Sequence, residues 1–270
     1  MKKLAALILG LSLILVACGG GQEAAAPEGE DNKIVIGVSP VPHAEIMDYL
    51  APKFEEAGLE VETVIFDDYV QPNEQLASGD LDANYFQHTP YFEDYIAKND
   101  LDLVSLGNVH IEPIGVYSDS IDALEDLKDG DEVIIPNDAT NGGRALILLS
   151  QAGVISLEDP TDLASTEKDI VDNPKNLKFI PMEAQNIPNT YKDATLAVIN
   201  SNYALGAGLN PSEDAIISEE ADSPYANLVA VRAGEEDQEK FKILMEVLQS
   251  EDTAAFLEEK YKGAILPSFE

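Results

Sequence analysis

The chain has 270 residues, which is enough for two lobes of ordinary size. Its 51 Asp and Glu residues outnumber 16 Lys and Arg residues, and the formal net charge of −35 excludes nucleic acid and anionic lipid as partners of the folded body. The single cysteine, Cys18, excludes an intrachain disulfide bond. We interpret the acidic excess as a solvated surface. A high-salt habitat, which would screen the repulsion between these charges, is a further hypothesis.

The N-terminus has the pattern of a bacterial lipoprotein signal. Two lysines precede an apolar run, Leu4–Val16, which is too short to cross a hydrocarbon layer of about 30 Å. The run leads into Leu-Val-Ala-Cys, which matches the lipobox in which the cysteine thiol receives a diacylglycerol. We therefore predict a signal peptide over residues 1–17 and a lipid on Cys18 that anchors the chain to the extracytoplasmic side of the cell membrane. Residues 18–32 lack periodic hydrophobic positions and are predicted to form a flexible tether.

The first ordered elements have the pattern of a parallel α/β sheet. The apolar run Ile34–Val38 predicts a buried strand, and a helix follows over His43–Ala57, with a kink or break expected at Pro52. A second strand over Val61–Phe66 and a short helix over Pro72–Ala77 come next. This βαβα order predicts a right-handed crossover and a parallel sheet.

The stretch from Gly79 to Tyr91 concentrates ring side chains where a strand is expected to end and a helix to begin. The strand is predicted over Leu81–Asn84, and Thr89-Pro90 fits a cap followed by the first helical turn. The ring side chains after this strand are Tyr85, Phe86, His88 and Tyr91. Open α/β sheets bind ligands at such positions, and aromatic walls suit a polarisable tail such as a thioether. A core aromatic cluster with one satisfied histidine is the alternative interpretation.

A second candidate site element follows the strand predicted over Glu132–Pro136. Residues 137–144 end in Gly-Gly-Arg, and a helix is expected over Ala145–Ala152. Unpaired N–H groups at a helix start, with glycines that allow close approach, can bind an anion. The guanidinium of Arg144 can bind a carboxylate through two parallel hydrogen bonds, although a surface ion pair is the alternative.

The remaining predicted elements alternate between strands and helices. They are strand Leu101–His110, helix Leu124–Asp131, helix Pro160–Leu163, strand Lys178–Pro181, helix Asn186–Tyr191, strand Ala194–Ile199, and helices Glu235–Gln249 and Asp252–Tyr261. Asn200 and Asn202 follow a strand, where their amides can serve a zwitterion. A helix cap by Asn200 or Ser201 is the alternative, and both roles can hold at once.

Two extended segments are predicted to cross between lobes, one near Pro113–Ser118 and one near Tyr225–Val229. They divide the chain into a discontinuous first lobe, residues 33–114 and 227–270, and a second lobe, residues 115–226. The predicted fold class is therefore α/β, with two lobes in the style of type II periplasmic binding proteins. Each lobe would hold a mostly parallel sheet flanked by helices, and the two crossings would act as hinges that close around a ligand.

An ordered series of motifs resembles the NlpA/MetQ family, the methionine-binding lipoproteins of bacterial ABC importers. Besides the stretch at Gly79–Tyr91, the resemblance is carried by VSPVPH at 38–43, HIEPIGVY at 110–117, PNDATNGGRA at 136–145, AVINSNYA at 197–204, SPYAN at 223–227 and KYKGAILP at 260–267. It covers nearly all of the mature chain.

The resemblance implies a monomeric capture protein for methionine that delivers its ligand to an ABC importer permease with its ATPase, and that needs no cofactor. It also implies roles for individual residues. Tyr69, Phe86, His88 and Tyr91 would line the side-chain pocket, Arg144 would bind the α-carboxylate, Asn202 and Asn227 would hold the amino and carboxylate groups, and Asn141 would contribute at the helix start. Another small amino acid or a methionine-containing dipeptide remains an open alternative.

Two other classes of function are weaker. Zinc capture would use the histidines His43, His88 and His110 with Glu112, but the sequence has no His-rich loop and no paired metal-ligand spacing. An enzyme is not expected, because the sequence has no GxSxG motif, no cysteine nucleophile outside the lipobox and no cofactor fingerprint.

Overall fold

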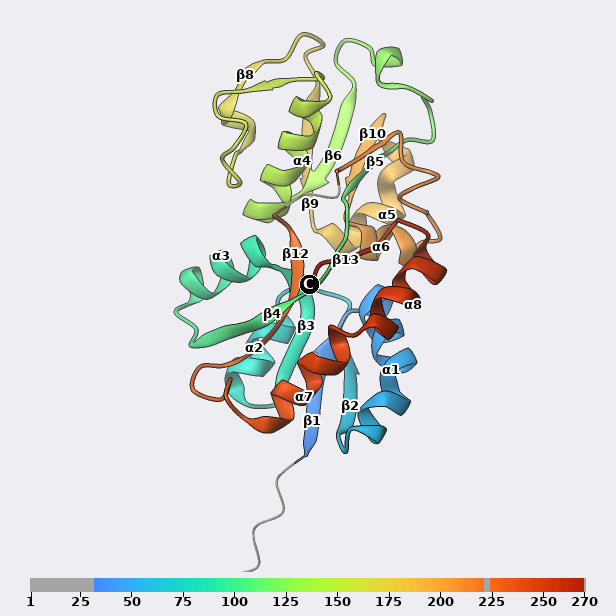
Figure 1. Cartoon of the computed structure of the whole chain (residues 1–270). Helices are drawn as coiled ribbons and strands as arrows, with labels where there is room; N and C mark the ends of the chain where they lie inside the picture. Colours follow the sequence, from blue (N-terminus) through green and yellow to red (C-terminus); the bar gives the residue numbers. More distant parts are fainter. Residues whose placement is uncertain (1–31, 221–223, 270) are drawn as a thin grey trace, which may run out of the picture. The chain divides into compact units, whose positions relative to one another are not determined.

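The computed structural model describes residues 32–220 and 224–269. The predicted signal peptide, the lipid site Cys18 and the tether up to residue 31 lie outside this part of the chain. Two sheets with their own helices make up the described residues (Figure 1). The chain leaves the first sheet after β4, enters the second at β5, and returns between β11 and β12. The predicted two-lobed α/β fold is confirmed, while the residue limits of the lobes stay a prediction. The prediction of a mostly parallel sheet in each lobe is wrong, because both sheets mix parallel and antiparallel strand pairs.

The first sheet has the strand order β13-β4-β12-β3-β1-β2. Its strands are β1 (Lys33–Val38), β2 (Glu60–Ile65), β3 (Ala83–His88), β4 (Leu103–Ile111), β12 (Ala226–Arg232) and β13 (Leu266–Pro267). The pairs β1–β2 and β1–β3 are parallel, and β12 runs antiparallel between β3 and β4. The ends of β3 and β4 therefore meet the start of β12 at one edge of the sheet.

Helices cover both faces of this sheet because its strands alternate apolar side chains between the two faces. The helices are α1 (Glu45–Glu56), α2 (Gln71–Ser78), α3 (Thr89–Asn99), α7 (Glu239–Leu248) and α8 (Glu251–Tyr261), and a π-helical turn, η1 (Pro40–Ala44), precedes α1. Ile34 and Ile36 of β1 belong to the core shared with α1, α7 and α8. Leu228 and Ala230 of β12 belong to a second core with α2 and α3.

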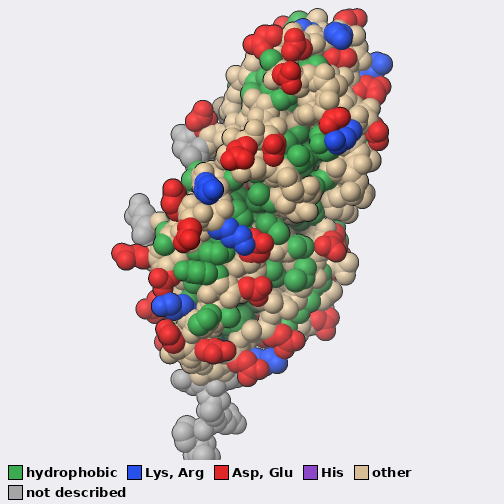
Figure 2. All heavy atoms as spheres, turned by 90° about the vertical axis from the view of Figure 1, so that its right-hand side faces the viewer, with side chains coloured by type: hydrophobic (Ala, Val, Ile, Leu, Met, Phe, Trp, Pro, Cys, Tyr) green, Lys and Arg blue, Asp and Glu red, His purple; other side chains and the backbone are tan. Residues whose placement is uncertain are grey.

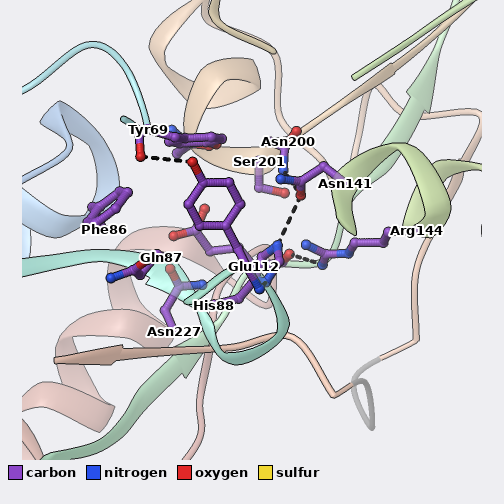
Figure 3. Close-up of a pocket in the computed structure, with 12 residues that line it drawn as sticks. Tyr69, Phe86, Gln87, His88, Glu112, Asn141, Arg144, Asn200, Ser201 and Asn227 are labelled. Carbon is purple, nitrogen blue, oxygen red and sulfur yellow. Dashed lines mark hydrogen bonds between the residues drawn. The ribbon is translucent and has the colours of Figure 1, made fainter. Parts of the chain in front are cut away.

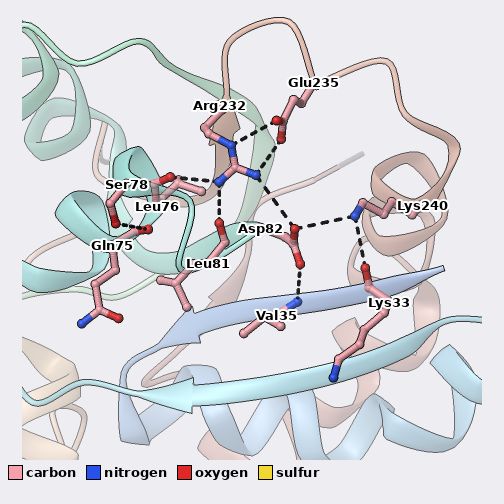
Figure 4. A network of polar contacts seen from close by, with 10 residues as sticks. All are labelled: Lys33, Val35, Gln75, Leu76, Ser78, Leu81, Asp82, Arg232, Glu235 and Lys240. Atoms are coloured by element: carbon pink, nitrogen blue, oxygen red, sulfur yellow. Dashed lines mark hydrogen bonds and ion pairs between the residues drawn. The ribbon is translucent and has the colours of Figure 1, made fainter. Parts of the chain in front are cut away.

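A network of polar side chains lies in the first lobe, at the end of the sheet where β12 ends (Figure 4). The carboxylate of Asp82 accepts a hydrogen bond from the Val35 amide at 2.8 Å and lies 3.7 Å from Lys240 Nζ and 3.9 Å from the Arg232 guanidinium. Arg232 also donates to the carbonyl of Leu76 at 2.9 Å. The network ties β1, α2, β12 and α7 together, so Arg232 has a structural role.

The second sheet has the strand order β11-β5-β10-β6-β9. Its strands are β5 (Gly115–Tyr117), β6 (Glu132–Pro136), β9 (Lys178–Met182), β10 (Leu196–Ile199) and β11 (Ile217–Ser218), and its helices are α4 (Ala139–Gln151), α5 (Ile187–Thr190) and α6 (Ser201–Gly206). A small hairpin pairs β7 (Ser156–Leu157) with β8 (Ile170–Asp172), and short 3₁₀ turns occur at Leu124–Asp126, Glu167–Asp169, Ala184–Asn186 and Tyr191–Asp193. Both α4 and α6 begin directly after strands, at the edge that faces the first lobe.

Several predicted boundaries are wrong for identifiable reasons. The strand predicted over Leu81–Asn84 is β3, which includes the aromatic stretch, because β3 is buried along its whole length and aromatic side chains suit such a strand. α1 runs through Pro52 without a break, and core packing of Leu50 and Phe54 on either side of Pro52 holds the helix together. Gly115–Tyr117 is a strand with neighbours on both sides, and residues 160–163 form turns instead of a helix.

The predicted glycine loop before Arg144 is also wrong, because α4 already begins at Ala139. A Cβ atom on Gly143 would lie 2.4 Å from the Leu163 carbonyl oxygen, and one on Gly142 would lie 2.9 Å from the Pro136 carbonyl oxygen. The two glycines therefore allow the helix to pack closely against neighbouring backbone, and no anion is needed to explain them.

The predicted solvated acidic surface agrees with the face shown in Figure 2, where Asp and Glu side chains are spread over the whole view. Within residues 32–220 and 224–269, no helix is both long and apolar enough to cross a membrane.

Candidate ligand-binding site

Side chains from both lobes line a pocket (Figure 3). The pocket is lined by Tyr69, Phe86, Gln87, His88, Tyr91, Glu112, Asn141, Arg144, Asn200, Ser201, Asn202 and Asn227. All eight of the ligand-binding residues predicted within the described chain are among them. The structure thus brings together side chains that lie up to 158 positions apart in the sequence, from Tyr69 to Asn227.

One end of the pocket is aromatic. The Tyr69 ring centroid lies 6.2 Å from that of Phe86 and 5.7 Å from that of Tyr91, and the Phe86 and Tyr91 centroids are 6.3 Å apart. The Tyr91 hydroxyl donates to the Tyr69 backbone carbonyl at 2.9 Å, which fixes the Tyr91 ring, and the Tyr69 hydroxyl donates to Asn202 Oδ1 at 2.6 Å, which fixes the Tyr69 ring. Ring edges and faces in this arrangement provide an apolar, polarisable surface for a sulfur-containing chain.

His88 joins the aromatic end to the polar end. It is the N-cap of α3, where its Nδ1 accepts the Tyr91 amide at 3.1 Å, so Thr89 is the first helical residue and not the predicted cap. With Nδ1 as the acceptor, the proton lies on Nε2, which donates to Asn141 Oδ1 at 3.0 Å. Burial, together with the nearby Arg144 guanidinium, lowers the pKa of His88 to about 3. The imidazole is therefore neutral at physiological pH.

A chain of amides fixes the orientation of Asn200. Asp138, the N-cap of α4, accepts the backbone amide of Asn141 at 2.9 Å and its side-chain Nδ2 at 3.0 Å, so Asn141 Oδ1 must point the other way. That oxygen accepts Asn200 Nδ2 at 2.7 Å. Asn200 Oδ1 is left as a buried acceptor with no hydrogen-bond partner among the described residues. The predicted anion role of the α4 N-terminus is not supported, because Asp138 already occupies the Asn141 amide.

Arg144 is 2% exposed and binds protein groups with part of its guanidinium. Its Nε and Nη2 form a two-point ion pair with Glu219, at 3.1 and 2.5 Å, and Nη2 also donates to the Glu112 carbonyl at 2.7 Å. The guanidinium carbon lies 4.2 Å from the centroid of the Tyr225 ring. The two-point bond predicted for a ligand is thus made to Glu219. In the part of the chain that the structure describes, Nη1 has no protein partner.

Asn202 and Asn227 each have their oxygen fixed by a protein donor. The Tyr69 hydroxyl donates to Asn202 Oδ1 at 2.6 Å, and Asn227 Oδ1 lies 3.1 Å from His43 Nε2. Neither side-chain nitrogen has a protein partner among residues 32–220 and 224–269. The polar end of the pocket therefore offers two amide donors and one guanidinium donor, beside the acceptor on Asn200.

Two of the three histidines proposed as zinc ligands lie together behind this polar end. The donor atoms of His43, His110 and Glu112 lie within 4.8 Å of one another, but His88 is committed to Asn141 and is not part of the group. His110 Nε2 lies 2.8 Å from Glu112 Oε1, and His110 Nδ1 is bonded to the Tyr85 hydroxyl. Burial lowers the pKa of His43 to about 4 and that of His110 to about 3, and it raises the pKa of Glu112. Hydrogen bonds among these side chains account for the group without a metal ion.

Sequence reasoning missed three residues that line the pocket, Gln87, Glu112 and Ser201. The side-chain amide of Gln87 forms hydrogen bonds with Asn73 and Asn84. The only sequence feature that could have indicated its place in the pocket is its position between Phe86 and His88. Glu112 was considered only as a zinc ligand and Ser201 only as a helix cap, although both line the pocket. Asn200, which was predicted to serve a zwitterion, also lines it. The positions of Glu112, Asn200 and Ser201 at strand ends were visible, whereas the direction of each side chain was not.

Comparison with known proteins identifies similar chains over almost the full length. Residues 34–269 match the family described as NlpA lipoprotein. The chain is 42% identical over 274 residues to the methionine-binding lipoprotein MetQ of Bacillus subtilis (strain 168), covering 99% of each chain. The structure of a nutrient binding protein from Burkholderia cenocepacia bound to methionine is similar with a TM-score of 0.84 and 43% identity, covering 87% of this chain and 100% of that chain. A periplasmic substrate-binding protein of an ABC transporter from Coxiella burnetii has a TM-score of 0.84 and 37% identity over the same shares, 87% and 100%.

Proposed function

Since the chain belongs to the NlpA lipoprotein family, we propose that it is a lipid-anchored substrate-binding protein that captures methionine and delivers it to an ABC importer. The family resemblance drawn from the motifs is confirmed. The named relatives support methionine as the ligand and an ABC transporter as the destination. The role proposed for this chain is binding and release, without chemical change of the ligand.

The observation that carries the proposal is the division of the pocket into an aromatic end and a polar end with both donors and an acceptor. The desolvation free energy of a zwitterion exceeds the free energy gained by burying it unless its charged groups form hydrogen bonds or ion pairs in the pocket. Arg144 Nη1 and the Asn227 amide would hold the α-carboxylate, with the Asn202 amide beside them. Asn200 Oδ1 would accept a hydrogen bond from the α-ammonium.

At the other end, Tyr69, Phe86 and Tyr91 would surround the thioether of methionine. His88 contributes a neutral ring because its pKa is about 3, so no buried cation opposes an apolar tail there. The two lobes would close around the ligand through the crossings that join the sheets.

The proposal extends to the location and partners of the chain. A lipid on Cys18 would hold it at the extracytoplasmic side of the membrane, and two acyl chains suffice for stable anchoring. The receiving partner would be a permease with its ATPase, and the capture protein would act as a monomer.

Calorimetric titration of L-methionine into residues 33–270, refolded to remove any carried ligand, tests this function. Norleucine, which replaces the sulfur with a methylene, should bind more weakly, and alanine, leucine and a zinc salt should give no comparable heat. Methionine at one-to-one stoichiometry is the expected result. Tight binding of another amino acid or of a methionine-containing dipeptide, without a response to methionine, would show that the pocket serves a different ligand.

A further inference from the structure

A buried histidine outside the pocket contacts a residue inside it. His43, in η1, is 0% exposed and does not line the pocket. Its Nε2 nevertheless lies 3.1 Å from the side-chain oxygen of Asn227, which does line the pocket and is 184 positions away in the sequence. No role in ligand capture follows from the position of His43 in the sequence, so its contact with Asn227 needs an explanation.

The hydrogen bonds around Glu112 fix where the protons lie. A carboxylate oxygen can only accept, so His110 carries its proton on Nε2 and donates it to Glu112 Oε1 at 2.8 Å, and His110 Nδ1 accepts the Tyr85 hydroxyl. The Asn202 backbone amide donates to the same carboxylate. His43 Nε2 lies 3.4 Å from Glu112 Oε1 and 3.1 Å from Asn227 Oδ1, and both of these oxygens are acceptors. His43 Nε2 must therefore carry a proton and donate it.

This donor determines which end of the Asn227 amide faces the ligand. With Oδ1 held by His43, the Nδ2 group is turned away from that contact, and it has no protein partner in the described chain. Asn227 is paired with His88 on β3 and with His110 on β4, and the register of β12 against β4 shifts immediately after it. Such irregularities re-aim side chains at sites, and here the side chain reaches the pocket (Figure 3).

We propose that His43, held in place by Glu112, is a positioning residue that makes Asn227 present an N–H donor to the pocket and so selects ligands that carry a carboxylate. The proposal rests on methionine capture as the function of the pocket. Without the His43 donor, the Asn227 amide can turn over and present its oxygen, which would repel a carboxylate. Ligands that lack a carboxylate would not depend on His43.

The test compares L-methionine with methioninol, in which a hydroxymethyl group replaces the carboxylate, by calorimetric titration into the full-length chain in detergent. His43→Phe keeps a ring but removes the donor, and it should weaken methionine binding at least tenfold while changing methioninol binding less than twofold. His43→Gln places an amide nitrogen near the position of Nε2 and should restore most of the affinity for methionine. In an Asn227→Ala background, His43→Phe should have no further effect.

Tyr85→Phe is the matched control, because it removes another hydrogen bond from the same buried group without touching Asn227, and it should change methionine binding less than twofold. Equal weakening of both ligands by His43→Phe, additivity in the Asn227→Ala background, or an equal effect of Tyr85→Phe would overturn the proposal. If His43→Phe does not fold, Asn227→Asp tests the proposal instead. It should weaken methionine binding at least tenfold while methioninol binding persists. Unchanged methionine binding would refute the role of the Asn227 amide as a donor. Failure of the unsubstituted chain to bind methionine would instead refute the proposed function.

Discussion

Arg144 is predicted to serve stability and ligand binding through different atoms, and replacing it by methionine separates the two. Arg144→Met removes the partner of Glu219, whose side chain is 11% exposed, while that of Arg144 is 3% exposed. Breaking a buried ion pair by removing one partner costs about 3–5 kcal/mol, because the other charge stays buried and unpaired. We expect a loss of about 3 kcal/mol, at the lower end of that range, since Glu219 keeps some contact with solvent.

The double variant Arg144→Met/Glu219→Gln removes both charges and should recover most of that stability, as measured by urea unfolding. Its methionine affinity should stay low, because the ligand carboxylate still lacks the guanidinium. A lost contact of this kind costs about 2–5 kcal/mol, which corresponds to roughly 30-fold or more in Kd. Glu219→Gln alone keeps Arg144 and is the matched control for binding. A double variant that binds methionine within about threefold of the parent chain, a change below roughly 0.7 kcal/mol, would refute the carboxylate role of Arg144.

Three further outcomes are expected. Cys18→Ala should release the chain from membranes without altering ligand affinity, and a variant that still sediments with membranes would contradict the lipid anchor. The pKa values of His43, His88 and His110, at about 4, 3 and 3, lie below the unfolded value near 6.5, so the unfolded chain binds more protons in this window and stability falls as the pH falls. Urea unfolding at pH 7.5 and pH 5 should show a loss of about 2 kcal/mol per histidine, offset in part by the raised pKa of Glu112, and equal stability at both pH values would contradict the burial of neutral rings. Asp82→Ala should lower the free energy of unfolding by about 1–2 kcal/mol with unchanged methionine affinity, and a loss of affinity without a loss of stability would contradict its structural role.

The sequence predicted the pocket better than it predicted the contacts inside it. Phe86, His88 and Tyr91 could be found because they follow one another where a strand leads into a helix, and Arg144 stood out because arginine is scarce in this chain. Glu219 could not be found, because nothing distinguishes one acid among 51. The ion pair between Arg144 and Glu219 is therefore determined by tertiary structure and could not be predicted from local sequence.

Other misses have the same origin in tertiary packing. Gly142 and Gly143 resemble an anion-binding loop locally, yet the close approach of Pro136 and Leu163 explains them. β13 pairs with β4 far from it in the sequence, and two residues carry too little pattern to predict a strand. The direction of the Asn200 and Asn227 amides depends on hydrogen bonds from distant segments, so no local pattern can encode it.

The most direct test of this account is a crystal structure of the chain with L-methionine bound in the pocket. We expect the carboxylate within hydrogen-bond distance of Arg144 Nη1 and Asn227 Nδ2, the ammonium on Asn200 Oδ1, and the sulfur among Tyr69, Phe86 and Tyr91. A ligand in the reversed orientation, with its ammonium beside Arg144, or one bound outside this pocket, would contradict the division of the site into donors, an acceptor and an aromatic end.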